Sequence, residues 1–327
     1  MTKRILIDSD AGICNDDCQA LVLALASRNL RVDGISVCAG NLTMQQSLYN
    51  ALTLAEYLGR PDIGVHSGEA NPRYHSYGDF ERRAYGQWGD DTPPVWPFGY
   101  APTMNPAEPP ARQWIPQCAQ AAPGEISAVA LGPLTNFAAA FDEQPATASN
   151  LSQLYFAGGT FDEFGAPSGN ITPEAEFNVW VDPEALETVI SSGIRLTIIP
   201  LHLMRRMNFD EQDAARISAI DTRVGRFYGT VLDQLEKAGQ PTGLAGGDVL
   251  GVAAVLWPEL FTFRSALVSV DCSAGDHYGR TSLRPSDGVS STTVAIECDI
   301  DEIRRRYLGT IGAPSDKIVV NADENAV

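Results

Sequence analysis

The chain has 327 residues, of which 44% are hydrophobic and 20% are charged, so it forms either one large α/β domain or two smaller ones. Its formal net charge of −18 disfavours a nucleic-acid backbone or an anionic membrane surface as a partner. No segment approaches the roughly 20 apolar residues of a membrane span or resembles a signal peptide, and six scattered cysteines favour reduced thiols, which together predict a cytoplasmic protein.

Short apolar segments bounded by turn residues alternate with helical patterns along most of the chain. This alternation predicts a mainly parallel central sheet with helices on both faces. In such sheets, ligands bind beyond the carboxyl ends of the strands. The predicted strands are residues 4–8, 32–40, 63–67, 127–131, 153–158 and 196–201. The predicted helices include residues 16–27, 43–58 and 183–192.

Residues 71–110 interrupt the alternation with many prolines and aromatic residues, which predicts an irregular, lid-like insertion in a single domain spanning 1–327. Towards the end of the chain, residues 266–271 and 292–299 alternate like the strands of a hairpin. Residues 299–308 predict a helix whose basic residues suit the negative end of the helix dipole.

Residues 4–21 read RILIDSDAGICNDDCQAL and place Asp8, Asp10, Asp16 and Asp17 at a strand–turn–helix junction. A single Asp after a strand is common, because Asp caps helices and favours turns. Four carboxylates brought together would repel one another, and a hard cation such as Ca²⁺ or Mg²⁺ removes that penalty by accepting oxygen ligands. The motif therefore predicts a cation site, with helix capping and solvation as the alternative.

The sequence resembles the inosine–uridine-preferring nucleoside hydrolase family, which opens with Asp-x-Asp-x-Gly followed by Asp-Asp at the start of a helix. The resemblance continues in order along nearly the whole chain. The later motifs are Ala39-Gly40-Asn41, Leu131-Gly132-Pro133-Leu134-Thr135-Asn136, Gly158-Gly159, Gly169-Asn170, Ala175-Glu176-Phe177-Asn178, Asp182-Pro183-Glu184-Ala185 and Asp248. This resemblance implies the nucleoside hydrolase fold with its Rossmann-like core, a nucleoside substrate, a place in nucleoside catabolism, and a homodimer or homotetramer.

The resemblance also implies that Ca²⁺ is bound by Asp10, Asp17, Asp248 and the backbone carbonyl of Thr135. Asp10 would in addition be the general base for a calcium-activated water, because a bound cation lowers the pKa of water. On the residues alone, Asp248 is equally typical of a helix N-cap, and Thr135 of a strand-to-helix turn.

The ribose hydroxyls would be held by side chains that offer hydrogen-bond donors and acceptors on several sides. The resemblance implies that these are Asp16, Asn41, Asn170, Glu176 and Asn178. Without the family pattern, Asn41 and Asn170 are typical of turns, and Glu176 and Asn178 of a half-exposed strand. The implied reaction is hydrolysis of the N-glycosidic bond of ribonucleosides through an oxocarbenium-like transition state.

The sequence departs from the family in three places. The opening turn is longer, with Ile13-Cys14-Asn15 where common members have a single residue. Tyr85-Gly86 stands nearest the position of a His-Gly pair, and Gly247 replaces a His that can protonate the departing base. Another group must then contact the base or activate the leaving group, although each candidate could instead pack in the core or on the surface. These candidates are Tyr85, His75, Trp88 and Tyr228.

Three other functions remain open on the residues. Asp8-Ser9-Asp10 also resembles the nucleophile motif of haloacid dehalogenase phosphatases, but Gly12 and a total of three lysines fit that class poorly. The missing His at Gly247 leaves open a non-catalytic, calcium-dependent ribosyl-binding protein. A hydrolase of a non-standard N-riboside is the third alternative. Serine-hydrolase, dinucleotide-binding and phosphate-loop signatures are absent from the sequence.

Overall fold

The computed structural model describes residues 2–12, 15–74, 101–165, 168–237, 239, 242–286 and 290–312. Nine strands in these ranges form one central sheet. They are β1 (Lys3–Ser9), β2 (Leu30–Val37), β3 (Val65–Ser67), β4 (Ile126–Ala130), β5 (Gln153–Ala157), β6 (Leu196–Ile199), β9 (Phe261–Val270), β10 (Thr281–Pro285) and β11 (Thr292–Cys298). Two short strands pair apart from it, β7 (Asn208–Phe209) and β8 (Leu244–Ala245).

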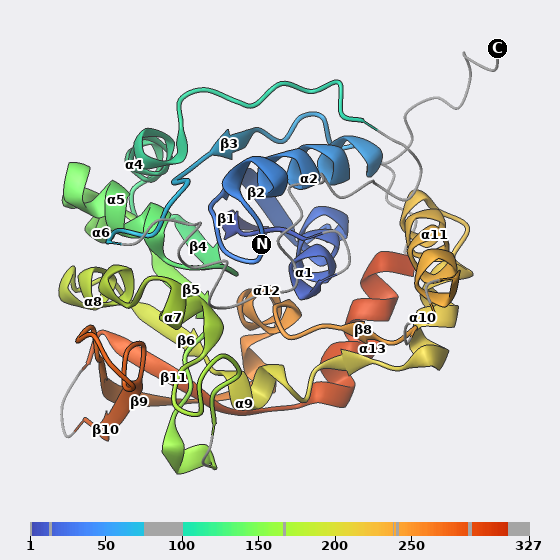
Figure 1. Ribbon diagram of the computed structural model, residues 1–327. Coiled ribbons are helices and arrows are strands. Elements are labelled where there is room, and N and C mark those ends of the chain that lie inside the picture. Colours follow the sequence, from blue (N-terminus) through green and yellow to red (C-terminus); the bar gives the residue numbers. More distant parts are fainter. Residues whose placement is uncertain are drawn as a thin grey trace.

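The strand order in the sheet is β10-β9-β11-β6-β5-β4-β1-β2-β3 (Figure 1). Strands β1 to β6 and β11 run parallel, whereas β9 and β10 are antiparallel at one edge. The chain builds β1, β2 and β3 outward, then returns to place β4 on the other side of β1. Open α/β sheets bind ligands at such a reversal, beyond the carboxyl ends of the strands. The predicted fold class is confirmed.

Helices cover both faces of the sheet (Figure 1). The α-helices are α1 (Asp16–Ala26), α2 (Met44–Tyr57), α4 (Ala111–Ala121), α5 (Thr135–Glu143), α6 (Ala146–Asn150), α7 (Phe177–Val181), α8 (Pro183–Ser191), α9 (Leu201–Met204), α10 (Glu211–Ser218), α11 (Arg223–Lys237), α12 (Val249–Leu256) and α13 (Ile300–Gly312). The 3₁₀ turns are η1 (Asp162–Phe164) and η2 (Pro258–Leu260).

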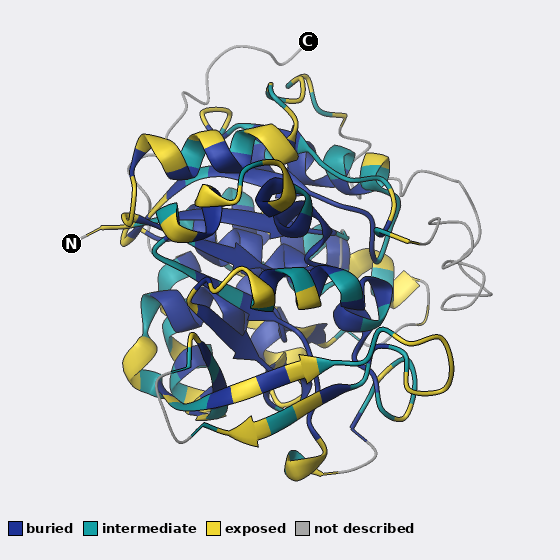
Figure 2. Ribbon diagram, turned by 90° about the vertical axis from the view of Figure 1, so that its left-hand side faces the viewer, coloured by how far each residue is buried: buried dark blue, intermediate teal, exposed yellow. Residues whose placement is uncertain are grey.

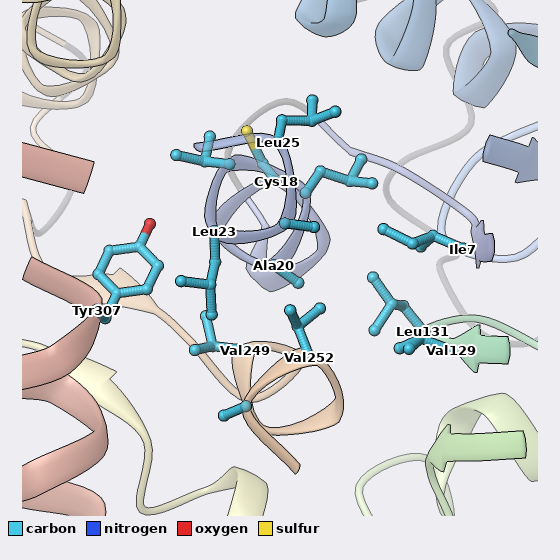
Figure 3. Close-up of a cluster of buried hydrophobic side chains, with 14 of the residues drawn as sticks. Ile7, Cys18, Ala20, Leu23, Leu25, Val129, Leu131, Val249, Val252 and Tyr307 are labelled. Atoms are coloured by element: carbon cyan, nitrogen blue, oxygen red, sulfur yellow. The ribbon is translucent and has the colours of Figure 1, made fainter. Parts of the chain in front are cut away.

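Successive residues of β1 enter two different cores, because side chains alternate across a strand. Ile5 and Ile7 pack in the core beneath α1, α2 and α12, whereas Leu6 packs in the core beneath α4, α5 and α8. Figure 3 shows the first core, where Leu23 of α1 lies against Val249 of α12. The strands are accordingly buried throughout the centre of the molecule, as Figure 2 shows, and only the β9–β10 edge is widely exposed.

The hairpin prediction is only partly correct. Residues 266–271 and 292–299 do fall in adjacent antiparallel strands, but β10 comes between them in the chain and pairs with the other side of β9. Strand β10 lies at the exposed edge, so it lacks the apolar pattern that identified the buried strands. Helix α13 extends to Gly312, beyond the predicted end at residue 308.

The predicted insertion at residues 71–110 falls largely on residues 75–100, which lie outside the described part of the chain. Its last residues are fastened to α2, where Glu56 accepts hydrogen bonds from the backbone N–H groups of Thr103 at 2.8 Å and Met104 at 2.7 Å. The single-domain organisation stays a prediction. All the described cysteines are free thiols, as expected. Among the described helices, none has the length and apolar character required to cross a membrane.

Candidate active site

Two helix N-termini bring the acidic residues together at the carboxyl end of β1. Asp16 and Asp17 open α1, and Asp248 stands at the N-terminus of α12, which packs against α1. One carboxylate oxygen from each of these three residues lies within 4.8 Å of the others. Residues from opposite ends of the chain therefore form one candidate metal centre.

Asp10, which follows β1, is fully buried beside this cluster. Its Oδ2 accepts a hydrogen bond from the backbone N–H of Asn41 at 2.5 Å, and its Oδ1 has no hydrogen-bond partner among the described residues. A Cβ atom added at Gly40 or Gly132 would overlap with this carboxylate. The two glycines therefore let the ends of neighbouring strands close around Asp10.

Asp17 is held by donors on both of its oxygens. The Ser9 hydroxyl donates to Oδ1 at 2.6 Å, and the Asn15 amide donates to Oδ2 at 2.7 Å. Asn15 belongs to the longer opening turn that distinguishes this chain. The lengthened turn thus supplies a group that orients Asp17, a contact that the sequence analysis did not predict.

Burial and mutual repulsion raise the pKa values of the acidic cluster. Burial raises the pKa of Asp10 to about 6 and that of Asp16 above its ordinary value. Burial, followed by the charges of neighbouring carboxylates, raises the pKa values of Asp17 and Asp248 well above their usual range. Asp248 Oδ1, like Asp10 Oδ1, is buried without a hydrogen-bond partner in the described structure. This all-oxygen set fits a hard cation such as Ca²⁺, which would offset the repulsion.

The structure places Thr135 as the first residue of α5, close to the end of β4. Its hydroxyl donates to Asp182 Oδ2 at 2.7 Å, and Asp182 in turn caps α8 by accepting from the N–H of Ala185 at 3.0 Å. The side chain therefore anchors the turn. The role of the Thr135 carbonyl as a metal ligand stays a prediction.

A cavity of about 420 Å³ opens beside the acidic cluster. All five residues predicted to bind ribose line it, together with Asp248. The complete lining among the described residues is Asp16, Asn41, Leu131, Asn170, Ile171, Glu176, Phe177, Asn178, Leu201, Met204, Arg205, Asn208, Ala245, Gly247 and Asp248. The predicted sugar and metal residues thus share one site in space.

Glu176 shapes one side of this cavity as the N-cap of α7. Its carboxylate accepts from the backbone N–H groups of Gly159 at 2.8 Å, Asn178 at 2.9 Å and Val179 at 3.2 Å. Burial nevertheless raises its pKa to about 7. The half-exposed strand considered for Glu176 and Asn178 is wrong, because Asn178 lies in helix α7.

The two other amides that line this side have defined orientations. Asn178 Nδ2 donates to the backbone carbonyls of Leu131 at 2.8 Å and Ala157 at 2.9 Å, which lie at the carboxyl ends of β4 and β5. Asn170 Oδ1 accepts from the N–H of Phe177 at 2.8 Å. The amide oxygen of Asn178 and the amide N–H groups of Asn170 therefore remain available to a ligand in the cavity.

The four residues considered for contact with the base or the leaving group do not all lie in the described part of the chain. Tyr85, His75 and Trp88 lie outside the described residues. Tyr228 does not line the cavity, and its buried hydroxyl donates to Gln19 Oε1 and lies 3.1 Å from the Tyr307 hydroxyl. The structure therefore places Tyr228 in the core beneath α1 rather than beside a bound base.

A side chain at Gly247, where many family members carry a His, would require its neighbours to shift. A Cβ atom there would lie 2.8 Å from Asp16 Oδ2 and 3.0 Å from the Cβ of Met204. The wall next to it is formed by α9 and the residues that follow, including Arg205 and Asn208. The sequence analysis missed both residues, because so short a helix shows no apolar periodicity that would single them out.

Asp8, the first carboxylate of the acidic motif, lies beneath the cluster in a separate group of polar residues. Asp8 is fully buried, and its Oδ1 accepts hydrogen bonds from the Ser36 hydroxyl and from Asn136 Nδ2 at 2.7 Å. Burial raises the pKa of Asp8 to about 7. Asn136 Oδ1 also accepts from the N–H of Glu69 at 2.8 Å. These bonds tie together the carboxyl ends of β1, β2 and β3.

The fold and the site define an α/β enzyme with an acidic centre and a polar cavity suited to a sugar. Comparison with known proteins identifies the family, because residues 5–305 match the inosine-uridine preferring nucleoside hydrolases. The chain belongs to this family. It is therefore an N-ribosyl hydrolase that cleaves ribonucleosides into ribose and free base. The phosphatase and non-catalytic alternatives are thereby set aside.

Individual relatives cover most of the chain. The pyrimidine-specific ribonucleoside hydrolase RihA of Shewanella woodyi is 32% identical, over 85% of this chain and 86% of its own. Uridine nucleosidase 1 of Arabidopsis thaliana is 28% identical, over 92% of this chain and 90% of its own. A solved plant nucleoside hydrolase superposes with a TM-score of 0.79 at 27% identity, covering 96% of this chain and 100% of that one.

Proposed function

We propose that this hydrolase acts on pyrimidine ribonucleosides, with uridine as the leading candidate, and that it requires Ca²⁺. The observation that carries the metal proposal is the convergence of Asp16, Asp17 and Asp248 beside the buried Asp10. The pyrimidine preference is supported by the names of the Shewanella and Arabidopsis relatives.

The residues proposed to hold Ca²⁺ are Asp10, Asp17, Asp248 and the carbonyl of Thr135. When bound, Ca²⁺ supplies positive charge that lowers the pKa of a water molecule and compensates the clustered carboxylates. One carboxylate oxygen of Asp16 lies within 4.8 Å of the carboxylate oxygens of Asp17 and Asp248. It is therefore positioned to join the ion or to bind a ribose hydroxyl beside it.

Asp10 is proposed to accept the proton of the attacking water. Its unpartnered Oδ1 has the capacity to do so, and the N–H of Asn41 holds the other oxygen in place. Asp16, Asn41, Asn170, Glu176 and Asn178 are proposed to hold the ribose. Their carboxylate and amide oxygens would stabilise the positive charge that develops on the sugar as the base departs.

The decisive test compares Asp10→Asn and Asp10→Ala with the wild-type enzyme, by measuring ribose released from uridine with Ca²⁺ and with chelator. We expect Asp10→Ala to abolish turnover. Asp10→Asn should retain part of the Ca²⁺ binding but lose at least ~10²-fold in kcat, because the amide cannot accept the proton. Asp301→Asn, on the exposed face of α13, is the matched control and should behave as wild type. Substantial turnover by Asp10→Asn would refute the role of Asp10.

Substrate class and assembly are tested on the same preparation. A panel of purine and pyrimidine ribosides should show the highest kcat/KM for uridine. Ca²⁺ binding without release of ribose from any natural nucleoside would instead favour a non-standard N-riboside. The homodimer or homotetramer and the cytoplasmic location stay predictions, the first checked by sedimentation equilibrium and the second by fractionation of the native cell.

A further inference from the structure

Among the described residues that line the cavity, those on one wall include no carboxylate. This wall is formed by α9, the residues after it and the end of β8, and it includes Met204, Arg205, Asn208, Ala245 and Gly247. The residues proposed to hold the ribose lie on other elements, namely the start of α1, the loop after β2 and the region of α7. With the ribose bound there, the α9 wall is a described surface that remains for the nucleobase, and it is the one that carries a cationic side chain.

Arg205 is the one cationic side chain among the described residues that line this cavity. Its guanidinium donates from Nη1 to the carbonyl of Ser168 at 2.9 Å and from Nη2 to the carbonyl of Gly169 at 2.6 Å. A guanidinium has five N–H groups in a fixed fork, so others remain to bind a ligand. The residue is exposed, and a ligand can therefore reach it.

The charge of Arg205 is not neutralised by a carboxylate in the described part of the chain. Its neighbour Arg206 contrasts with it, because Nη1 of Arg206 lies 2.5 Å from a carboxylate oxygen of Glu297. An arginine that lines a cavity without a carboxylate partner, in a protein of net charge −18, is available to an anionic or electron-rich group of the ligand.

We propose that Arg205 binds the nucleobase and stabilises the negative charge that the base acquires as it leaves. This inference rests on the proposed function. The C1′–N bond breaks and its electron pair goes to the base nitrogen, while the oxygen of water bonds to C1′ and its proton passes to Asp10. The N–H groups of Arg205 hold the base anion until it takes up a proton from solvent, and Asp10 returns its proton to solvent.

Arginine suits this task in a site where Gly247 has no side chain to donate a proton. The guanidinium does not lose its own proton at any ordinary pH, so it acts by charge and hydrogen bonding rather than as a general acid. Its bonds to Ser168 and Gly169 also orient it, because they fix the plane of the guanidinium against the loop that leads to Asn170.

The test must separate this role from simple support of that loop. Two ribosides with the same sugar and different leaving groups make the distinction: uridine, whose base leaves with difficulty, and 4-nitrophenyl β-D-ribofuranoside, whose nitrophenolate leaves as a stable anion without help. Disturbance of the loop around Asn170 would alter the handling of the common ribose and would affect both substrates equally.

We expect Arg205→Gln to lose ~10²-fold in kcat for uridine, the usual effect of removing one donor that stabilises a developing anion, and to keep most of its activity on the nitrophenyl riboside. Arg205→Lys, which keeps the charge but not the fork, should recover part of the uridine activity. Arg206→Gln is the matched control and should leave the ratio of the two activities at its wild-type value.

Equal losses on both substrates, or no loss on uridine, would overturn the assignment of Arg205 to the leaving group. Thermal unfolding of each variant shows that the compared proteins are folded. Failure of the proposed function has a different signature, because wild-type enzyme would then release no ribose from uridine.

Discussion

Asp8, Asp10 and Asp248 share an unusual condition: each keeps one buried oxygen without a hydrogen-bond partner in the described structure. A buried, unpartnered carboxylate oxygen costs free energy unless the group is protonated or bound to a cation. Glu176, which is equally enclosed, differs because three backbone N–H groups satisfy its oxygens. The unpartnered oxygens of Asp10 and Asp248 are therefore available to the proposed cation, whereas the three N–H groups fix the orientation of the Glu176 carboxylate.

Substitution of Tyr228 tests whether this side chain supports the core or the active site. Its hydroxyl donates to Gln19 Oε1, and both side chains are almost completely buried. Tyr228→Phe leaves that oxygen without a donor and should lower the free energy of unfolding by ~1–3 kcal/mol. Turnover of uridine should stay near the wild-type value, because Tyr228 does not line the cavity. Urea unfolding and steady-state kinetics measure the two quantities.

Tyr307→Phe is the matched control for that variant. The Tyr307 hydroxyl lies 3.1 Å from the Tyr228 hydroxyl, and its removal leaves the bond from Tyr228 to Gln19 in place. We therefore expect a smaller loss of stability. A large fall in kcat for Tyr228→Phe, without loss of stability, would instead support the contact with the base that the sequence analysis considered.

At the level of elements, the carboxyl ends of the parallel strands must approach closely for the site to form. Gly40 follows β2, and a Cβ atom there would overlap with Asp10. Gly40→Ala should therefore displace this carboxylate, lower kcat, and lower the free energy of unfolding by ~1–3 kcal/mol through overpacking. Kinetics with uridine and urea unfolding check both effects.

Gly309, in α13, is the contrasting position. No atom lies within 4 Å of an added Cβ there, so Gly309→Ala should raise the free energy of unfolding by up to ~1 kcal/mol through helix propensity, with unchanged kcat. If Gly40→Ala were as stable and active as Gly309→Ala, the strand ends would not be as close as the structure indicates.

The elements differ in how far the sequence could predict them. Strands β1 to β6 were recognised from their apolar segments, which are continuous where both faces are buried, as in the centre of β1 and in β6. Strand β10 was missed because its edge position exposes most of its side chains. Residues 177–181 were not predicted to be helical either, because α7 has five residues and its start depends on the cap formed by Glu176 rather than on periodicity.

For the whole molecule, the acidic site couples stability to pH. Burial raises the pKa of Asp10 to about 6 and that of Glu176 to about 7, above the values of the unfolded chain. Between about pH 4 and about pH 7, the metal-free folded state therefore binds more protons than the unfolded state, and its stability falls as pH rises through this window. Ca²⁺ binds the deprotonated carboxylates, so its stabilising effect should grow over the same range.

Thermal unfolding with Ca²⁺ and with chelator measures this coupling. The Tm of the chelated protein should fall between about pH 4 and about pH 7, while the increase caused by Ca²⁺ becomes larger. At 100 times its Kd, Ca²⁺ should add about 2.7 kcal/mol to the free energy of unfolding. Asp248→Asn removes one predicted ligand and should abolish most of this increase. An effect of Ca²⁺ that is independent of both pH and Asp248 would place the ion elsewhere.

Many of the strands and helices, the acidic motif and the family resemblance could be predicted from the sequence, because hydrophobic period, turn residues and motif spacing are local properties. Only the tertiary structure brings Asp248 next to Asp16 and Asp17, leads Arg205 to the cavity and keeps Tyr228 away from it. Such contacts join residues far apart in the chain, and they depend on how the helices pack over the sheet, which no local pattern specifies.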